Sequence, residues 1–328
     1  MTRQIEDAYD DEPPNNWGRW GEDDELGALN FLTEREVLRG VRAVEHGKTF
    51  TLGAPIAHPD GDPVWPGRHD ADHFMVQDYG HILSGKFDPE TMNNKKYTDD
   101  ILTLFTHGTT HFDALGHSWY GDSLYNGFDQ ETTMGGLDRN GIEHMATHGI
   151  VGRGVLLDVP RHRGVDRLEG NSRVTLDEMR ACAEAQGVDL EKRDVILLRT
   201  GATELWYAEG PEAYREMYER DHGDEPDVHL PGITYSRELV EWFRDMEIPA
   251  YCTDTLGFEQ THSETTGITH SLHPAFIRDL GIAGNEISLF GDLAADCADD
   301  GKYDFLFVAA PLRIVGGTGG PVNPVVVK

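Results

Sequence analysis

Histidines and one aspartate recur at even spacing in one segment of the chain. The segment reads His107-Gly-Thr-Thr-His111-Phe-Asp113-Ala-Leu-Gly-His117, so its imidazoles and carboxylate lie at offsets 0, 4, 6 and 10. Alternate residues of a strand point to one face, whereas a helix would place Asp113 about 240° round from His107. The Thr-rich, aromatic composition also favours extended backbone, although two glycines argue against one regular strand. We therefore predict an extended segment that presents these side chains on one side.

These side chains are suited to binding a divalent metal ion. Imidazole nitrogens and a carboxylate oxygen form a ligand set for Zn²⁺, Mn²⁺ or Fe²⁺. A site with three protein ligands leaves a position for water, whose pKa the metal lowers toward neutrality. A histidine-rich loop that merely caps a sheet is the alternative. Three histidines and an aspartate in phase favour the metal site.

Other candidate sites carry weaker signals. His144 and His148 have helical i,i+4 spacing but lack the glutamate of a His-Glu-x-x-His motif. Cys252 is a nucleophile candidate, against the alternative of a buried core thiol. Neither a Gly-x-Ser-x-Gly elbow nor a Gly-x-Gly-x-x-Gly fingerprint follows a strand-like run. The glycine-rich segment 316–320 lacks the Lys-Ser/Thr of a phosphate loop, and we predict a turn there with closely approaching backbones.

Strand-like and helix-like patterns alternate along the chain, which predicts an α/β fold. Capping-box patterns predict helices after Thr33 and Thr175, and a third helix is expected at 235–246. The stretch 57–98 is rich in Pro, Gly, His and Asp and is predicted to be loop. Strands are expected at 101–105, 154–159, 194–199, 287–290 and 305–309. Because these strands cluster toward both ends, we expect a mixed β-sheet core flanked by helices.

Residues 1–48 are predicted to form an N-terminal extension (an arm) with one helix, and residues 49–328 a single catalytic domain.

Charge and cysteine usage limit the partners and the compartment. The chain has 59 acidic and 28 basic residues, for a net charge of −31, which disfavours nucleic acid and anionic membranes as partners. Its start lacks a signal-peptide pattern, and no run approaches the ~20 apolar residues of a membrane span. Three distant cysteines indicate reduced thiols, so we expect a cytoplasmic protein. Because only seven basic residues are lysine, we hypothesise adaptation of the acidic surface to high salt, a halophilic trait.

The histidine segment resembles the motif of the metal-dependent cyclase-type hydrolases, a family that includes bacterial kynurenine formamidase and isatin hydrolase. The family pattern is His-x-Gly-Thr-His-x-Asp-x-x-x-His, and this chain matches it at the four functional positions (the three histidines and the aspartate), with Thr109 where the family usually has glycine. Segments 20–30, 152–158, 194–201 and 310–322 are also similar to the family, so the resemblance covers most of the chain.

The resemblance implies roles for particular residues. His107, His111 and Asp113 would bind the metal, and His117 would be the general acid/base. His273 and Glu286 would complete the ligand set, with His270 a competitor of His273. One or two divalent ions per subunit, Zn or Mn, are implied.

The resemblance also implies a reaction and an assembly. The reaction would be hydrolysis of a small cyclic or N-acyl amide (a formamide, lactam or imide) in a homodimer or homotetramer. A cyclase or lactonase acting on an oxygen ester, and a non-catalytic metal or small-ligand binding protein, are the alternatives. Phe112, Trp119 and Tyr120 would either wall an aromatic-substrate pocket or pack the core.

Overall fold

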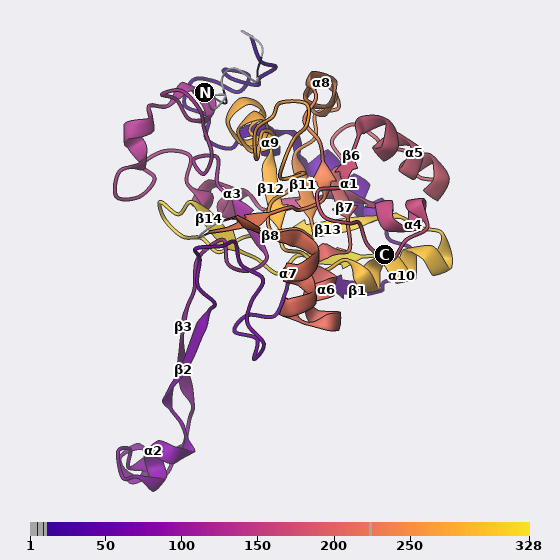
Figure 1. The fold of residues 1–328 in the computed structure, drawn as a ribbon. Helices are drawn as coiled ribbons and strands as arrows, with labels where there is room; N and C mark the ends of the chain where they lie inside the picture. The colour runs from indigo at the N-terminus through magenta and orange to yellow at the C-terminus, as the bar shows by residue number, and fades with distance from the viewer. Residues whose placement is uncertain (1–4, 6–8, 10–11, 223–224) are drawn as a thin grey trace.

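A mixed β-sheet forms the centre of the molecule. The computed structural model describes residues 5, 9, 12–222 and 225–328. Within these residues nine strands form one sheet, in the order β1 (Thr49–Thr51), β15 (Val325–Val327), β13 (Asp304–Ala309), β5 (Ile150–Asp158), β7 (Val195–Arg199), β11 (Ala250–Thr253), β12 (Ala283–Glu286), β4 (His111–Asp113) and β14 (Gly319–Pro321) (Figure 1). Strands β5, β7, β11 and β12 run parallel, and the flanking strands join them antiparallel. The α/β fold with a mixed sheet is confirmed.

The parallel strands β5, β7 and β11 are buried along almost their whole length, and their largely apolar sequences are typical of strands covered on both faces. The helices around the sheet are α1 (Glu34–Arg42), α3 (Ile142–His148), α4 (Val159–Arg163), α5 (Leu176–Gln186), α6 (Ala202–Glu209), α7 (Pro211–Tyr218), α8 (Arg237–Asp245), α9 (Leu272–Pro274) and α10 (Gly291–Asp300). Short 3₁₀ segments lie at η2 (Gly27–Phe31), η4 (Tyr125–Gly127) and η5 (Gln130–Thr133), and a π-helical segment at η6 (Ala275–Leu280). Two small ribbons pair β6 (Arg173–Val174) with β10 (Gly232–Ile233) and β8 (Glu219–His222) with β9 (Glu225–Val228). No helix in the described residues has the length and apolarity of a membrane span.

Local capping signals correctly predicted the starts of α1 and α5, and the helix expected at 235–246 is present as α8, which begins at Arg237. The capping box of Thr33 and Glu36 is present at the start of α1. The Thr175 hydroxyl accepts a hydrogen bond from the Glu178 backbone N–H at α5, and Ser236 caps α8 in the same way. The strands predicted at 154–159, 194–199 and 305–309 correspond to β5, β7 and β13.

Two of the expected local structures are wrong. The strand expected at 287–290 lies earlier, as β12, because Ile287 adopts a left-handed conformation with φ 58° that ends the extended backbone. The stretch 57–98, expected to be loop throughout, contains β2 (Asp72–Gln77), α2 (Tyr79–Leu83) and the 3₁₀ turn η3 (Pro89–Met92). The strand expected at 101–105 is present as β3 (Asp99–Thr103), but it pairs with β2 and not with the central sheet.

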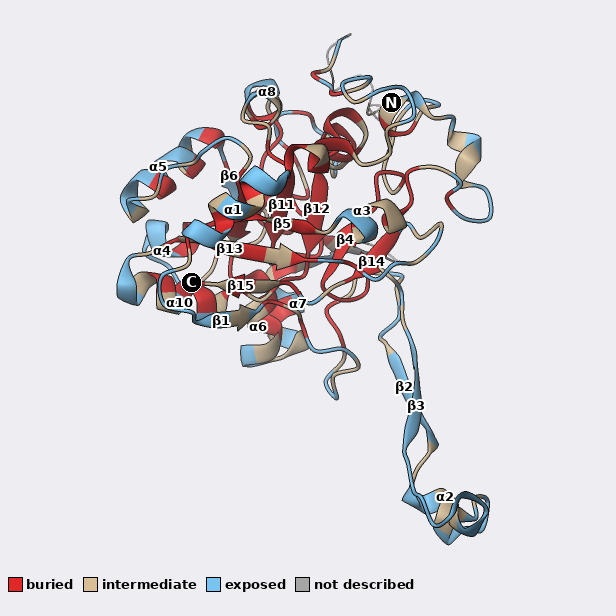
Figure 2. Cartoon of the chain, turned by 180° about the vertical axis from the view of Figure 1, so that it is seen from behind, coloured by how far each residue is buried: buried red, intermediate tan, exposed pale blue. Residues whose placement is uncertain are grey.

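Strands β2 and β3 form a hairpin arm, residues 72–103, that projects far from the body and carries α2 at its tip (Figure 1). Nearly the whole arm is exposed (Figure 2), including apolar side chains: Phe74 and Ile101 are 55% and 52% exposed, and Leu83 is 71% exposed. A two-stranded ribbon is marginally stable on its own in water. The arm therefore presents an apolar surface that the rest of this chain leaves uncovered.

The N-terminal helix α1 packs closely on the sheet. A Cβ on Gly40 would lie 2.6 Å from the backbone of Gly152 in β5, so glycine permits the close approach. Arg39 of α1 and Arg153 of β5 both pair with the buried carboxylate of Asp194, with N–O distances of 2.9 and 2.7 Å. These charges join the N-terminal extension to the central strands. The division at residue 48 stays a prediction.

Replacing Arg153 by methionine should lower the free energy of unfolding by about 3 kcal/mol or more, because it removes one partner of a buried carboxylate. Chemical denaturation measures this loss. Arg180→Met is the control: its partner Asp177 is 91% exposed, so the loss there should stay below about 1 kcal/mol. Equal losses in the two variants would contradict the importance of the buried pair.

Candidate active site and metal centre

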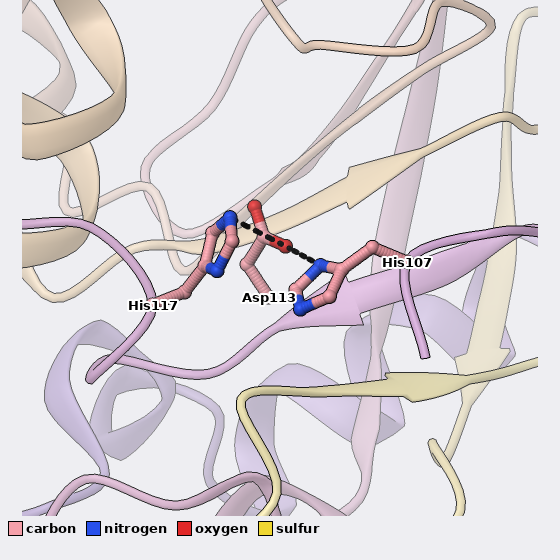
Figure 3. Close-up of side chains that lie close together, drawn as sticks. All are labelled: His107, Asp113 and His117. Atoms are coloured by element: carbon pink, nitrogen blue, oxygen red, sulfur yellow. Dashed lines mark hydrogen bonds and ion pairs between the residues drawn. The ribbon is translucent and has the colours of Figure 1, made fainter. Parts of the chain in front are cut away.

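The predicted site residues meet at the β12–β4–β14 edge of the sheet. His111 and Asp113 lie on β4 two residues apart, so their side chains share one face. His107 lies in the turn before β4 and His117 in the turn after it, and Figure 3 shows both imidazoles beside Asp113. The extended segment is thus confirmed only at 111–113. Turns closed by Gly108 N–H to the Phe105 carbonyl, and by His117 N–H to the Ala114 carbonyl, replace it at the two ends.

Asp113 lies at the centre of the cluster. Its Oδ1 is 2.9 Å from His107 Nδ1 and 3.9 Å from His117 Nε2 (Figure 3). The same oxygen is 3.2 Å from His111 Nε2. Burial opposes ionisation of this carboxyl, but the surrounding imidazoles hold its pKa well below the usual range. Asp113 is therefore a buried carboxylate that gathers imidazoles from three parts of the segment.

The neighbouring strand β12 and helix α9 supply two more groups. Glu286 pairs in register with His111 across the antiparallel β12–β4 ladder, and its Oε2 lies 3.5 Å from His111 Nε2. His273 Nε2 is 3.1 Å from Glu286 Oε1 and 4.0 Å from Asp113 Oδ2. His270 forms no ion pair with a carboxylate of the described residues, so His273, and not its competitor His270, lies beside Asp113 and Glu286.

His273 is held in position from its far side. Its Nδ1 lies 2.7 Å from Glu259 Oε1, and Phe258 stacks on its ring with centroids 3.9 Å apart. Burial lowers the pKa of His273, but its hydrogen bonds to Glu259 and Glu286 outweigh this and raise the pKa to about 10. A carboxylate behind an imidazole is a frequent arrangement around metal ligands, because it fixes the ring orientation.

The cluster fits a divalent metal ion. His111 Nε2 and Asp113 Oδ2 are buried and make no hydrogen bond with the described residues. Unpaired buried polar atoms of this kind are costly, and an ion would satisfy both. Ligand atoms lie within 4.8 Å of one another in two overlapping triads, His107–Asp113–His117 and His111–Asp113–Glu286. Mixed imidazole and carboxylate donors suit zinc or manganese.

Two imidazoles of the cluster are electrically neutral near pH 7. Burial and the nearby His117 lower the pKa of His107 to about 3. Burial also lowers the pKa of His117. A neutral imidazole has a free nitrogen that can bind a metal ion or accept a proton.

A cavity of about 270 Å³ opens beside the cluster. Its lining residues are Trp65, Arg68, His117, Ser118, Leu256, Gly257, His270, His273 and Glu286. Phe112, Trp119 and Tyr120 do not line this cavity. Phe112 is fully buried in the core, and Tyr120 donates a hydrogen bond to Asp279 instead.

The weaker candidate sites do not reach the cavity. His144 and His148 lie on α3 as predicted, but His144 pairs with Glu25 at 42% side-chain exposure. Burial raises the pKa of the Cys252 thiol well above its usual value, which favours the core-thiol interpretation. Separately, Asp227, His229 and His262 form a partly exposed cluster in which both imidazoles hydrogen-bond to the aspartate.

The glycine-rich segment contributes residues that sequence reasoning did not assign to the site. Strand β14 pairs with β4, with Gly319 opposite Asp113, and a Cβ on Gly319 would lie 2.6 Å from the His107 ring. Thr318 Oγ1 is 3.1 Å from His107 Nε2. The predicted close approach of backbones is confirmed, and its partner is the metal-site strand. Glu259, Trp65 and Arg68 were also missed, because no spacing in the sequence relates them to His107.

Comparison with known proteins agrees with this geometry. The model of the Cyclase family, described as "Putative cyclase", matches residues 50–260. The chain belongs to the Cyclase family. Comparison with curated protein sequences finds no match.

Solved structures extend the similarity to almost the whole chain. A crystal structure of a novel cyclase is 31% identical with a TM-score of 0.84, covering 96% of this chain and 100% of that one. Isatin hydrolase A from Labrenzia aggregata, bound to benzyl benzoate, is 18% identical with a TM-score of 0.59, covering 88% and 96%. An isatin hydrolase bound to the product analogue thioisatinate is 17% identical with a TM-score of 0.58, covering 90% and 99%. The two isatin hydrolases are similar to this Cyclase-family chain in fold.

Gly319→Ala should reduce metal affinity by about 10- to 100-fold, the usual effect of disturbing the surroundings of a metal ligand. The added methyl group would displace the His107 ring from Asp113. Elemental analysis after dialysis against defined metal concentrations measures the effect. Gly80→Ala, in the exposed helix α2, is the control and should bind metal normally. Normal metal content in Gly319→Ala would count against His107 as a ligand.

Proposed function

We propose that this protein is a metal-dependent hydrolase that cleaves the C–N bond of a small cyclic or N-acyl amide. The observation that carries the proposal is the buried, incompletely hydrogen-bonded Asp113 cluster, which opens through His117 onto a cavity. The fold shared with isatin hydrolases supports an amide or lactam substrate. The small cavity supports a small substrate.

His107, His111 and Asp113, with His273 and Glu286, would hold one or two divalent ions, Zn or Mn. When bound, the metal would polarise the substrate carbonyl and lower the pKa of water. Asp113 belongs to both triads of ligand atoms, so it would be a ligand of the centre with either one or two ions. Glu259 and Phe258 keep His273 oriented toward this centre.

His117 serves as the general acid/base in this proposal. It is the most exposed imidazole of the cluster, at 26% side-chain exposure, and it lines the cavity. Its neutral ring can accept a proton from the attacking water at Nε2. Asp113, 3.9 Å away, stabilises the imidazolium that results. The same nitrogen then delivers the proton to the leaving nitrogen of the amide.

Substitutions at Asp113 and His117 should separate metal binding from proton transfer. Asp113→Asn should remove both bound metal and turnover, because it removes the shared anionic ligand. His117→Ala should retain metal but lower kcat by ~10²–10⁴-fold, the usual contribution of a general acid/base. Elemental analysis and turnover of an N-formyl arylamide, an isatin-like lactam and a lactone provide the readouts.

His144→Ala, on the exposed side of α3, is the matched control for these variants. Near-normal hydrolysis by His117→Ala would contradict the proposed role of His117 as the general acid/base. Turnover of the lactone alone would favour an oxygen-ester hydrolase, and full metal content without any turnover would favour a binding protein.

We also propose that the protein is a homo-oligomer in which the hairpin arm packs on a second copy. The arm's apolar side chains are uncovered, and an identical chain supplies a partner for every arm through closed symmetry. The charges of the arm also support a second copy of the chain as its partner. Residues 79–98 at the tip carry Lys86, Lys95 and Lys96 against two acidic residues, whereas the whole chain has a net charge of −31. These three lysines, out of seven in the chain, would be attracted to the acidic body of a second copy.

Shortening the arm should lower the oligomeric mass. Gln77 and Asp99 are paired, so replacing residues 78–98 by Asn-Gly would close the ribbon with a two-residue turn. Sedimentation velocity compares this variant with the full chain. Lys86→Glu/Lys95→Glu/Lys96→Glu should weaken association, and more strongly at low salt. An oligomer unchanged by both variants would exclude the arm as the contact.

A further inference from the structure

Residues 57–71 form a loop that contributes Trp65 and Arg68 to the cavity lining, and hydrogen bonds to one carboxylate fix its shape. The buried carboxylate of Asp62 accepts hydrogen bonds from the backbone N–H groups of Ala57, His58 and Ala71, at 3.1, 3.1 and 2.9 Å. A carboxylate that binds both ends of a loop in this way closes it into a ring. The residues between them are therefore held in one loop shape by hydrogen bonds within the loop.

A tight turn within this loop aims two side chains at the cavity. In Trp65-Pro-Gly-Arg68 the Arg68 N–H donates to the Trp65 carbonyl at 3.0 Å, and Gly67 has φ 91°, the pattern of a type II turn. Both Trp65 and Arg68 line the cavity. Arg68 Nη1 also donates to the His107 carbonyl at 2.9 Å, which fixes the guanidinium beside the metal-site segment.

The guanidinium of Arg68 is a cation in the lining of the cavity. Among the described residues it makes no ion pair with a carboxylate, although the chain has more than twice as many acidic as basic residues. Glu286 is the carboxylate in the cavity lining, and it is already bonded to His273 and to the Phe258 backbone N–H. The other N–H donors of Arg68, which lines the cavity, thus make no ion pair with Glu286 or with another described carboxylate. A guanidinium offers planar paired donors that match a carboxylate.

A second polar atom near this turn is also unsatisfied. His270 packs edge-on against Trp65 with ring centroids 4.8 Å apart, and it lines the same cavity. Its Nε2 is buried and makes no hydrogen bond with the described residues. The His270 nitrogen, the Arg68 donors that are not bonded to His107 and the Trp65 indole all belong to the cavity lining, and groups of these kinds suit a planar polar ligand.

We propose that the substrate carries a carboxylate, which Arg68 binds while Trp65 and His270 contact the adjoining planar part of the molecule. This inference rests on the proposed function, since it assumes that the reacting amide lies between this subsite and His117. It narrows the substrate class from small amides in general to small anionic amides.

The test uses benzoate and benzamide, two ligands of nearly equal shape that differ in charge. Isothermal titration of the metal-containing protein should show tighter binding of benzoate. Arg68→Gln should weaken benzoate binding by about 10- to 100-fold, the range for a hydrogen bond to a charged group, and leave benzamide binding unchanged. Arg68→Lys should recover part of the loss because it restores the charge. Arg173→Gln, at a 64% exposed arginine outside the cavity, is the matched control.

The measurement needs no turnover, so it stands even if amide hydrolysis fails. Metal content and melting temperature are recorded for each variant, to separate loss of the subsite from loss of the metal or of the fold. A benzoate preference that Arg68→Gln leaves intact would mean that the carboxylate binds elsewhere, for example on the metal, and would overturn the proposal. Equal affinity for the two ligands, or no binding of either, would overturn it as well.

Discussion

The contact between the buried carboxylate of Asp113 and its surrounding imidazoles constrains the rest of the site. A carboxylate removed from water is unfavourable unless partners compensate for its lost hydration. His107 and His111 approach Asp113 most closely, and His117 and His273 lie about one ångström further out. The turns on the two sides of β4 bring His107 and His117 toward Asp113. The part of the cluster between residues 107 and 117 is thus formed by local chain reversal around one short strand.

Sheet topology adds the more distant groups. Strand β4 lies between β12 and β14, which come from residues more than 150 positions later in the chain. The pairing of β12 with β4 brings Glu286 beside His111. The pairing of β14 with β4 brings Gly319 so near His107 that a larger residue would contact the ring. The pairing of β4 with β12 therefore places Glu286 on one side of the cluster. Its pairing with β14 places Gly319, which has no side chain, on the other side.

The sequence predicted the local features of this arrangement better than the distant ones. Even spacing identified His107, His111, Asp113 and His117, because these residues lie within one short segment. It did not reveal the two turns, since the even offsets are also compatible with turns on either side of a three-residue strand. Resemblance to a family pointed to His273 and Glu286, whereas Glu259 and Arg68 depend on loop paths that no local pattern encodes. Likewise, an apolar run at 101–105 predicted a strand but could not show that its partner is β2 and not the central sheet.

The hairpin arm has a mechanical consequence for the centre. Its last strand, β3, ends at Thr103, and only three residues separate that end from His107. The part of the chain that reaches furthest from the body is therefore continuous with the part that must be placed most accurately. A displacement of the arm would therefore reach His107 through residues 104–106, and the hydrogen bonds of His107 to Asp113, Thr318 and Arg68 would oppose it.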